Sequence, residues 1–363
     1  MTEALSGTKT VAASHSFDVS SLEDYLANHL VGFSGPLAVE QFKGGQSNPT
    51  YKLTTPGCAY VMRSKPGPAA KLLPSAHAIE REFSVMRALR DSAVPVPRVL
   101  LLCENENVIG RSFYVMEFLP GRVLWDQSIP SVDRASRGAI YDELNRVIAA
   151  LHTVDVAEVG LGGFGKPGNY FERQIGRWTK QYLASVTLPI PQMDRLIEWL
   201  PANIPSSARN EHRASIVHGD YRIDNVMFDA SEPRAIAVLD WELSTIGHPL
   251  ADFSYHCVSW HIAPGQFRGI AGLDLDALGI PDEEHYVRTY CERTGRTGAG
   301  EGVDAVMNDW NFYLAYNLFR MSGILQGIAK RVEAGIATGE HARAAGASAR
   351  TLAELGWKLA QEA

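Results

Sequence analysis

The sequence predicts an α+β protein in two parts, a strand-rich part over residues 1–120 and a helix-rich part over residues 121–363. Before residue 121, most apolar residues fall in short runs bounded by glycine and proline, which is typical of antiparallel strands. After it, apolar residues recur with helical spacing through long segments. The chain has 363 residues, of which 45% are hydrophobic and 21% charged, so it can form two domains or one bilobal unit and does not have the composition of a disordered protein.

The strand-rich part begins with a loose polar leader, followed by a short helix over residues 20–30. Ser20 and Glu23 have the spacing of a capping box, which predicts the beginning of this helix. Strands are expected over residues 42–55, 58–66, 94–104 and 112–121. One long helix, residues 75–91 with Ser75 as candidate N-cap, is inserted among them.

The helix-rich part contains one exception to its helical pattern. Helices are expected over residues 139–154, 171–186, 308–331 and 347–361. Between the second and third of these, residues 226–229 and 235–240 flank the turn ASEPR. These two runs are predicted to form a β-hairpin.

Charge and cysteine content exclude several kinds of protein. A net charge of −7 argues against a general nucleic-acid binder. The four cysteines are too far apart for a CxxC metal site and fit a reducing cytosol. The N-terminus lacks the apolar core of a signal peptide, and no apolar run is long enough to cross a bilayer. We therefore expect a cytoplasmic protein that acts on a small molecule, with no nucleic-acid or membrane partner; no pattern predicts an oligomeric state.

The segment IVHGDYRIDNVMFD, residues 216–229, gathers polar residues between apolar flanks. Asn225 follows Asp220 by five residues, and the expected hairpin brings Asp240 back toward Asn225. Carboxylate and amide oxygens suit Mg²⁺, which also keeps waters and substrate phosphates. Protein kinases place a catalytic aspartate five residues before a metal-binding asparagine, with a second metal-binding aspartate further along. The spacing predicts phosphoryl transfer, with Asp220 as the base and Asn225 and Asp240 as Mg²⁺ ligands.

Taken singly, these residues have ordinary structural explanations, because Gly-Asp and Asp-Asn pairs are common in turns. The ordered set carries the prediction. Within the segment, His218 is expected to brace the loop, Asp224 to shape the turn or face the acceptor, and Asp229 to begin the hairpin turn.

A glycine-rich stretch in the first part fits a loop that covers phosphates. Its glycines permit close backbone approach, and its amides and serine hydroxyl can donate to phosphate oxygens. The loop residues are Gly44, Gly45, Gln46, Ser47 and Asn48.

The helix over residues 75–91 offers two carboxylates, Glu80 and Glu82. At about 100° per residue, Glu82 falls within the apolar stripe of the helix and Glu80 falls outside it, toward solvent. An inward carboxylate needs a cationic partner. Arg63 and Lys65 of the preceding strand face the same side and are the candidates.

Together these motifs resemble the aminoglycoside phosphotransferase and choline kinase-like superfamily. The resemblance rests on HGDYRIDNVMFD and AVLDWELSTIGHPLADF, with GGQSNPTY, YVMRSKP, LLPSAHAIEREFSVMRAL, VPVPRVL, FYVMEFLPGR and YFERQIGRW around them. The chain is most similar to the branch that is also found fused to acyl-CoA dehydrogenase-like domains. The resemblance covers about residues 40–330.

The resemblance implies a bilobal protein-kinase-like fold that uses ATP and Mg²⁺. It implies that Arg63 rather than Lys65 contacts the phosphates and that Asp252 braces the catalytic loop through its backbone. An interlobe hinge is expected at about residues 116–121, with adenine near the backbone of Glu117, Phe118 and Leu119. His248 departs from the aspartate that is usual at its position, and its role is left open.

The phosphoryl acceptor is the least determined part of the function. The resemblance suggests a hydroxyacyl compound, such as a hydroxyacyl-CoA, or an aminoglycoside. The candidate acceptor-binding residues are Arg222, Asp224, Trp241 and Glu242. Two alternatives remain, a non-catalytic ATP-binding module of the same fold and a metal-dependent phosphoesterase.

Overall fold

The computed structural model describes residues 7–44, 48–67, 78–166, 168–209, 214–296, 302–335 and 340–363. The chain divides into two compact units. Unit 1 comprises Met1–Trp125 and Asn225–Ser244, and unit 2 comprises Asp126–Asp224 and Thr245–Ala363. The first crossing lies close to the expected division at residues 120 and 121. The hairpin expected within the helix-rich part groups with unit 1, so no single boundary in the sequence separates the two units.

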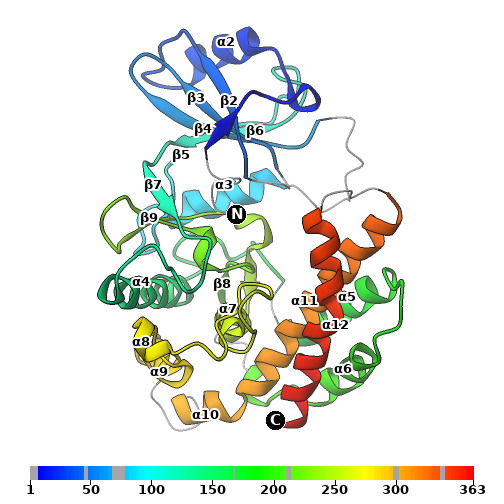
Figure 1. The fold of residues 1–363 in the computed structure, drawn as a ribbon. Helices are drawn as coiled ribbons and strands as arrows, with labels where there is room; N and C mark the ends of the chain where they lie inside the picture. Colours follow the sequence, from blue (N-terminus) through cyan, green and yellow to red (C-terminus); the bar gives the residue numbers. More distant parts are fainter. Residues whose placement is uncertain are drawn as a thin grey trace. The chain divides into compact units, whose positions relative to one another are not determined.

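Unit 1 is built around a six-stranded antiparallel sheet in the order β1-β2-β3-β4-β6-β5 (Figure 1). Its strands are β1 Thr8–Lys9, β2 Ala38–Phe42, β3 Thr50–Thr54, β4 Ala59–Ser64, β5 Val99–Cys103 and β6 Phe113–Glu117. The helices are η1 Ala13–His15, α2 Val19–His29 and α3 Ile79–Leu89, and η5 Trp241–Leu243 follows the hairpin.

Successive side chains of this sheet point alternately to the face covered by α2 and to the face covered by α3. On one face, Met62 and Phe113 join Leu22 and Leu26 of α2 in a buried apolar cluster. Because successive residues of a strand point to opposite faces, Arg63 lies on the other face. Arg63 is directly opposite Tyr114 in the register of β4 and β6. The alternation therefore places a cation on the face that α3 covers.

The predicted capping box at the beginning of α2 is wrong. Helix α2 begins at Val19, and the side chain of Asp18 accepts from the backbone N–H groups of Ser20 and Ser21. Glu23 accepts instead from the backbone N–H of Leu37 at 2.9 Å. Aspartate is as good an N-cap as serine, and here it stands two residues earlier in the chain. The candidate cap Ser75 lies outside the described residues.

A second sheet of unit 1 has three strands in the order β10-β9-β7. Strands β9 Val226–Asp229 and β10 Ala235–Val238 form the predicted hairpin, and β7 Gly121–Val123 pairs with β9. A Cβ at Gly121 would lie 2.6 Å from the backbone oxygen of Phe228, so this position requires glycine for close approach. Asp229 accepts from the backbone of Ser231 and Glu232 and closes the hairpin turn.

Unit 2 is mainly helical. Its helices are α4 Arg134–Thr153, α5 Tyr170–Leu183, α6 Pro191–Ala202, α7 Pro249–Cys257, α8 Leu275–Leu278, α9 Glu283–Arg293, α10 Val303–Asn308, α11 Trp310–Glu333 and α12 Glu340–Gln361. Short helices are η2 Ser207–Arg209 and η6 Val258–Trp260, and η4 Ile223–Asn225 crosses from unit 2 into unit 1. Strands β8 Ser215–Val217 and β11 Thr245–Gly247 pair antiparallel.

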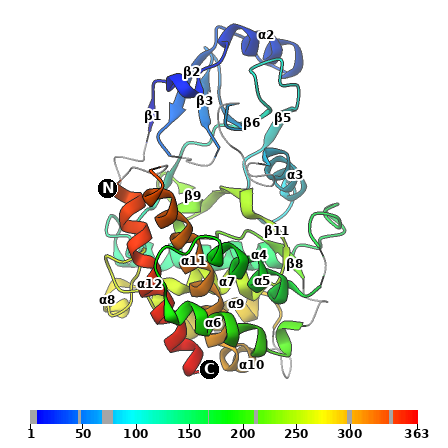
Figure 2. The ribbon, with the colours of Figure 1, turned by 90° about the vertical axis from the view of Figure 1, so that its right-hand side faces the viewer.

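The long helices α11 and α12 lie side by side in both views (Figure 1, Figure 2). Helix α11 also packs against α5 and α7, and its buried face includes Phe312, Leu314 and Leu318. The segments expected to be helical from residue 139 onward correspond to α4, α5, α11 and α12. Among the described residues, no helix combines the length and apolar character needed to cross a bilayer.

Candidate active site

The loop after β8 is held by a buried aspartate of α7. Asp252 is 3% exposed and accepts from the backbone N–H of His218 at 2.6 Å and of Gly219 at 2.8 Å. Gly219 has a φ of 82°, which lets the chain turn so that both N–H groups face one carboxylate. Asp252 therefore has the bracing contacts that the resemblance implies.

A neutral histidine supports this carboxylate. His152 Nε2 lies 3.3 Å from Asp252 Oδ2, and Nδ1 lies 2.7 Å from the hydroxyl of Tyr290. Burial lowers the pKa of His152, so Nε2–H donates to Asp252 while Nδ1 accepts from Tyr290. Burial alone would raise the pKa of Asp252, but the hydrogen bonds from His152 and the His218 backbone hold it below its usual value.

Asp220 stands at the exposed end of the braced loop. Its side chain is 19% exposed, and Oδ1 accepts from the hydroxyl of Tyr255 at 2.6 Å. Oδ2 lies 3.0 Å from Arg222 Nη2. The Asp220 backbone N–H donates to His218 Nδ1 at 3.2 Å, and Arg320 donates to the Gly219 carbonyl. The carboxylate is fixed from two sides but still reaches solvent.

Asp224 is buried and paired with two arginines. Its side chain is 3% exposed, with Oδ2 2.8 Å from Arg268 Nη2 and Oδ1 3.6 Å from Arg222 Nε. Sequence reasoning missed Arg268, which lies in a loop between η6 and α8 without a motif around it. It also missed Tyr255 and Arg320, whose places depend on how α7 and α11 pack.

The predicted pair of Arg63 and Glu82 is present in unit 1. Arg63 Nε lies 2.9 Å from Glu82 Oε2, and both side chains are at most 10% exposed. Glu82 also accepts from Asn48 Nδ2 at 2.8 Å and from the Tyr114 hydroxyl at 3.0 Å. Burial alone would lower the pKa of Arg63, but Glu82 and the other carboxylates raise it, so the guanidinium is charged. Asn48, predicted in the phosphate loop, directs its side chain to Glu82.

Lys65 and Glu80 form a separate ion pair. Both side chains are partly exposed. This pairing engages Lys65 away from Glu82 and leaves Arg63 as the cation beside that carboxylate. Glu80, expected to be solvated, is partly exposed and paired.

The hairpin of unit 1 brings Asn225 and Asp240 together, as expected from the sequence. The backbone N–H of Leu239 donates to the Asn225 carbonyl at 2.8 Å, immediately before Asp240. Asp240 has a φ of 65°, a left-handed conformation that is uncommon for a residue with a side chain. One oxygen of Asp240, Oδ1, lies 2.7 Å from Arg63 Nη2.

Asn225 and Asp240 fit a hard divalent cation by the chemistry of their donors. A carboxylate and an amide oxygen are suitable Mg²⁺ ligands, since Mg²⁺ takes one or two protein oxygens and completes its shell with water and phosphate. Among the described residues, no three histidine, cysteine, aspartate or glutamate side chains gather in a group that could hold a metal. Two such donors would suit an ion that takes its remaining ligands from water and phosphate.

The two residues after Asp240 differ in their surroundings. Trp241 is 1% exposed, and its Nε1–H donates to the Val238 carbonyl at 2.9 Å. This candidate for acceptor binding is thus placed to support the turn after β10, because its ring packs in the interior. Glu242 lies 3.7 Å from Arg63 Nη2, on the Arg63 side of the hairpin.

The expected adenine segment follows the end of β6. Glu117 Oε1 accepts from the backbone N–H of Arg98 at 2.8 Å, and Lys52 Nζ lies 4.9 Å from the ring centre of Phe118. Leu119, the last residue of the segment, is half-buried. Of the predicted phosphate loop, Gly44 lies just after β2, and Gly45, Gln46 and Ser47 lie outside the described residues. The side chain of Glu117 thus ties this segment to the backbone of Arg98.

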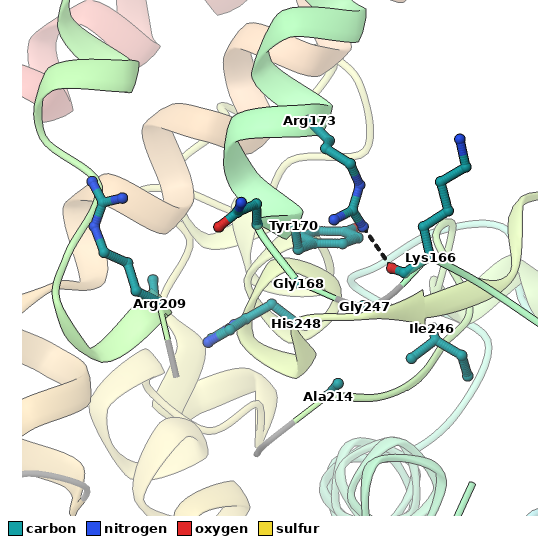
Figure 3. Close-up of a pocket in the computed structure, with 11 residues that line it drawn as sticks. Lys166, Gly168, Tyr170, Arg173, Arg209, Ala214, Ile246, Gly247 and His248 are labelled. Carbon is teal, nitrogen blue, oxygen red and sulfur yellow. Dashed lines mark hydrogen bonds between the residues drawn. The ribbon is translucent and has the colours of Figure 1, made fainter. Parts of the chain in front are cut away.

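His248 lines a pocket of unit 2 together with the basic residues Lys166, Arg173 and Arg209 (Figure 3). His248 Nδ1 accepts from the Leu250 N–H at 3.3 Å and caps α7, while its ring stacks on Tyr313. Burial lowers the pKa of His248 to about 3, so it is neutral. Nearby, Arg209 pairs with Glu172 at 2.5 Å. These contacts account for His248 as a structural residue.

Comparisons with known proteins identify the family of the chain. The model of the phosphotransferase enzyme family matches residues 38–290. The chain is 43% identical to acyl-CoA dehydrogenase family member 10 of Mus musculus, over 97% of this chain and 32% of that protein. It is 42% identical to acyl-CoA dehydrogenase family member 11 of Rattus norvegicus, over 98% of this chain and 44% of that protein. The chain thus spans less than half the length of these curated relatives.

Solved structures show the same fold. A protein of Ralstonia eutropha JMP134, provisionally described as an aminoglycoside phosphotransferase, is 60% identical with a TM-score of 0.86, over 96% of this chain and 99% of that one. Aminoglycoside phosphotransferase APH(4)-Ia, in a ternary complex with ADP and hygromycin B, is 16% identical with a TM-score of 0.59, over 93% and 98%. The second likeness shows the fold alone.

Fold and family model together define a phosphotransferase with a kinase-like α+β architecture, which confirms the predicted fold class. The chain belongs to the phosphotransferase enzyme family. The predicted enzyme class, a phosphotransferase, is thereby confirmed.

Proposed function

We propose that the chain transfers the γ-phosphoryl group of ATP to a hydroxyl of a small molecule. The observation that carries this proposal is the braced loop, in which Asp252 fixes the backbone before Asp220 and leaves the Asp220 carboxylate in contact with solvent. A general base must be held in place and still reach the proton it accepts.

In this reaction Asp220 accepts the hydroxyl proton as the alcohol oxygen bonds to the γ-phosphorus. The bond from that phosphorus to the bridging oxygen breaks, and ADP leaves with the electron pair. Arg63, held by Glu82, orients the phosphates of ATP, and the backbone of Gly44–Asn48 covers them. Adenine binds near the backbone of Glu117–Leu119. Mg²⁺ bound by Asn225 and Asp240 would neutralise the negative charge that develops on the phosphates.

The names of the curated relatives suggest where to look for the acceptor. Those proteins are named for acyl-CoA dehydrogenases, so hydroxylated acyl compounds are the first acceptor class to test. Aminoglycosides are the second class, because of the description of the Ralstonia eutropha protein.

The test is ADP release from ATP and Mg²⁺ in the presence of each acceptor class. Acceptor-dependent ADP release, with a phosphorylated product detected by mass spectrometry, supports the proposal. Tight ATP binding without turnover on any acceptor would instead indicate a non-catalytic nucleotide-binding module. Hydrolysis of a generic phosphate ester without ATP would favour the phosphoesterase alternative.

A further inference from the structure

Two arginines of unit 2 share one buried carboxylate beside Asp220. Arg222 and Arg268 contact opposite oxygens of Asp224, at 3.6 Å and 2.8 Å. Arg222 also lies 3.0 Å from Asp220. The proposed catalytic base is therefore linked through one arginine to a second.

Three groups of this cluster reach solvent, the Asp220 carboxylate and the two guanidinium groups. The Asp224 side chain is 3% exposed, whereas the side chains of Arg222 and Arg268 are 20% and 30% exposed. The negative partner is covered and the guanidinium groups reach solvent. A solute that approaches Asp220 in unit 2 consequently meets two arginines.

The two guanidinium groups also repel each other. Burial lowers the pKa of Arg268, and the charge of Arg222 lowers it further, against the opposing effects of Asp224, Tyr255 and Asp220. Like charges that share one carboxylate are stabilised when a further anion lies between or beside them.

The backbone holds Arg268 ready for such a contact. Its φ of 61° lies in the left-handed region, which seldom accommodates a long side chain. The turn is closed by the Gly269 N–H donating to the Gln266 carbonyl at 2.9 Å, and the Gln266 N–H donates to Ala263 at 3.1 Å. A fixed guanidinium loses less freedom when it binds a ligand.

We propose that Arg222 and Arg268 bind an anionic group of the acceptor, a carboxylate or a phosphate, and so select negatively charged acceptors. Arginine suits this role because its planar fork of N–H donors matches both anions. The inference rests on the proposed function and names the substrate class of that site. It excludes polycationic acceptors such as aminoglycosides, whose ammonium groups would be repelled.

The inference is tested by acceptor charge in the wild-type chain. The probes are straight-chain hydroxy acids, their methyl esters, their CoA thioesters and the aminoglycoside kanamycin, each with ATP and Mg²⁺. We expect the acids or the CoA thioesters to be phosphorylated with a higher kcat/KM than the esters. Preference for the acids assigns the anion as a carboxylate, and preference for the thioesters assigns it as a phosphate. Equal use of the esters, or a preference for kanamycin, would overturn the inference.

Variants locate the selection at Arg268. In Arg268→Gln, the KM for the anionic acceptor should rise about 10- to 100-fold, the effect of one lost hydrogen bond between charged groups, with the KM for ATP unchanged. Arg268→Lys keeps the charge and should recover part of the preference over the ester. Arg209→Gln removes another arginine of unit 2 that pairs with a carboxylate, and should match the wild type. An unchanged acid-to-ester ratio in folded Arg268→Gln and Arg268→Lys would refute the assignment.

Binding separates this inference from the proposed function. Calorimetric titration of the same acids and thioesters, without ATP, measures anion recognition alone. Binding that Arg268→Gln weakens supports the inference even if no acceptor is phosphorylated, in which case the proposed function fails by itself. If acceptors are phosphorylated but their binding does not depend on their charge, the inference fails and the proposed function stands.

Discussion

Arg63 is the residue on which the nucleotide-binding half of the proposed site depends. It contacts Glu82 at 2.9 Å, Asp240 at 2.7 Å and Glu242 at 3.7 Å, and its side chain is only 10% exposed. A buried ion pair is costly to break on one side, because the remaining charge keeps its desolvation penalty without a partner.

We therefore predict that Arg63→Met destabilises the protein by about 3–5 kcal/mol, the range for removing one member of a buried pair. The double variant Arg63→Met with Glu82→Gln should recover much of this loss, since no uncompensated carboxylate remains. Urea unfolding of both variants measures the free energies. If the double variant is no more stable than Arg63→Met, the buried charge of Glu82 is not the cause.

At the residue scale, the sequence predicts those side-chain positions that follow from the helical period or from the alternation of a strand. Helical spacing turns Glu82 inward and Glu80 outward, and strand alternation gives Arg63 the α3-facing side, so these placements follow from local geometry. The burial of Trp241 depends on packing between η5 and α3, which no spacing reveals. Arg268 reaches Asp224 from a loop 44 positions later in the chain, beyond the reach of any periodic argument.

At the scale of elements, the small sheet of unit 1 is the support for Asn225 and Asp240. Strand β9 lies between β7 and β10, and Gly121 of β7 faces the Phe228 backbone of β9. The hairpin was predictable because a turn-rich stretch separates two β-prone runs. The pairing of β7 with it was not, because β7 and β9 are more than a hundred residues apart.

Gly121→Ala should disturb this sheet. The added Cβ would lie 2.6 Å from a backbone oxygen that cannot move without shifting β9, so we expect a loss of about 1–3 kcal/mol, typical of overpacking. Gly57→Ala is the matched control, since no atom lies within 4 Å of a Cβ built there. Denaturant unfolding of the pair measures the difference. Equal stability of the two variants would show that β7 accommodates the added Cβ without a loss in the free energy of unfolding.

Neutral histidines are buried in α4, in α7 and at the N-cap of α7, which makes unit 2 sensitive to acid. Burial lowers the pKa of His248 to about 3 and of His256 to about 4, and it also lowers that of His152. Below about pH 6.5 the unfolded chain binds protons on these residues and the folded chain does not. The contribution of these histidines to the free energy of unfolding is therefore fully present above that pH. It is lost as the pH falls toward their pKa values in the folded chain.

As the pH falls through this range, the free energy of unfolding should decrease by about 1.4 kcal/mol per pH unit for each such histidine. Urea unfolding from pH 7 to pH 4.5 measures it. His256→Asn removes one of the titrating groups and should give a shallower slope than the wild type. A free energy of unfolding that does not change over this range would contradict the neutral state of these histidines.

On the scale of the whole molecule, the proposed residues come from both units. Asp220 and Asp252 belong to unit 2, and Asn225 and Asp240 belong to unit 1. The composition shift near residue 121 predicts two parts, because strand-rich and helix-rich stretches differ in hydrophobic period. It cannot predict that Asn225–Ser244 returns to the first part, since that depends on long-range pairing. The fold class was predictable because several motifs occur in the order that the family shares.

The central claim is that Asp220 accepts the hydroxyl proton during phosphoryl transfer from ATP. Its most direct test is steady-state turnover of Asp220→Asn on whichever acceptor the wild-type chain phosphorylates. We predict a fall in kcat of about 10²- to 10⁴-fold, the usual contribution of a general base. The affinity for ATP should stay unchanged, and Asp276→Asn, at an exposed aspartate of α8, should behave as the wild type. A folded Asp220→Asn variant that retains the wild-type kcat would contradict the claim.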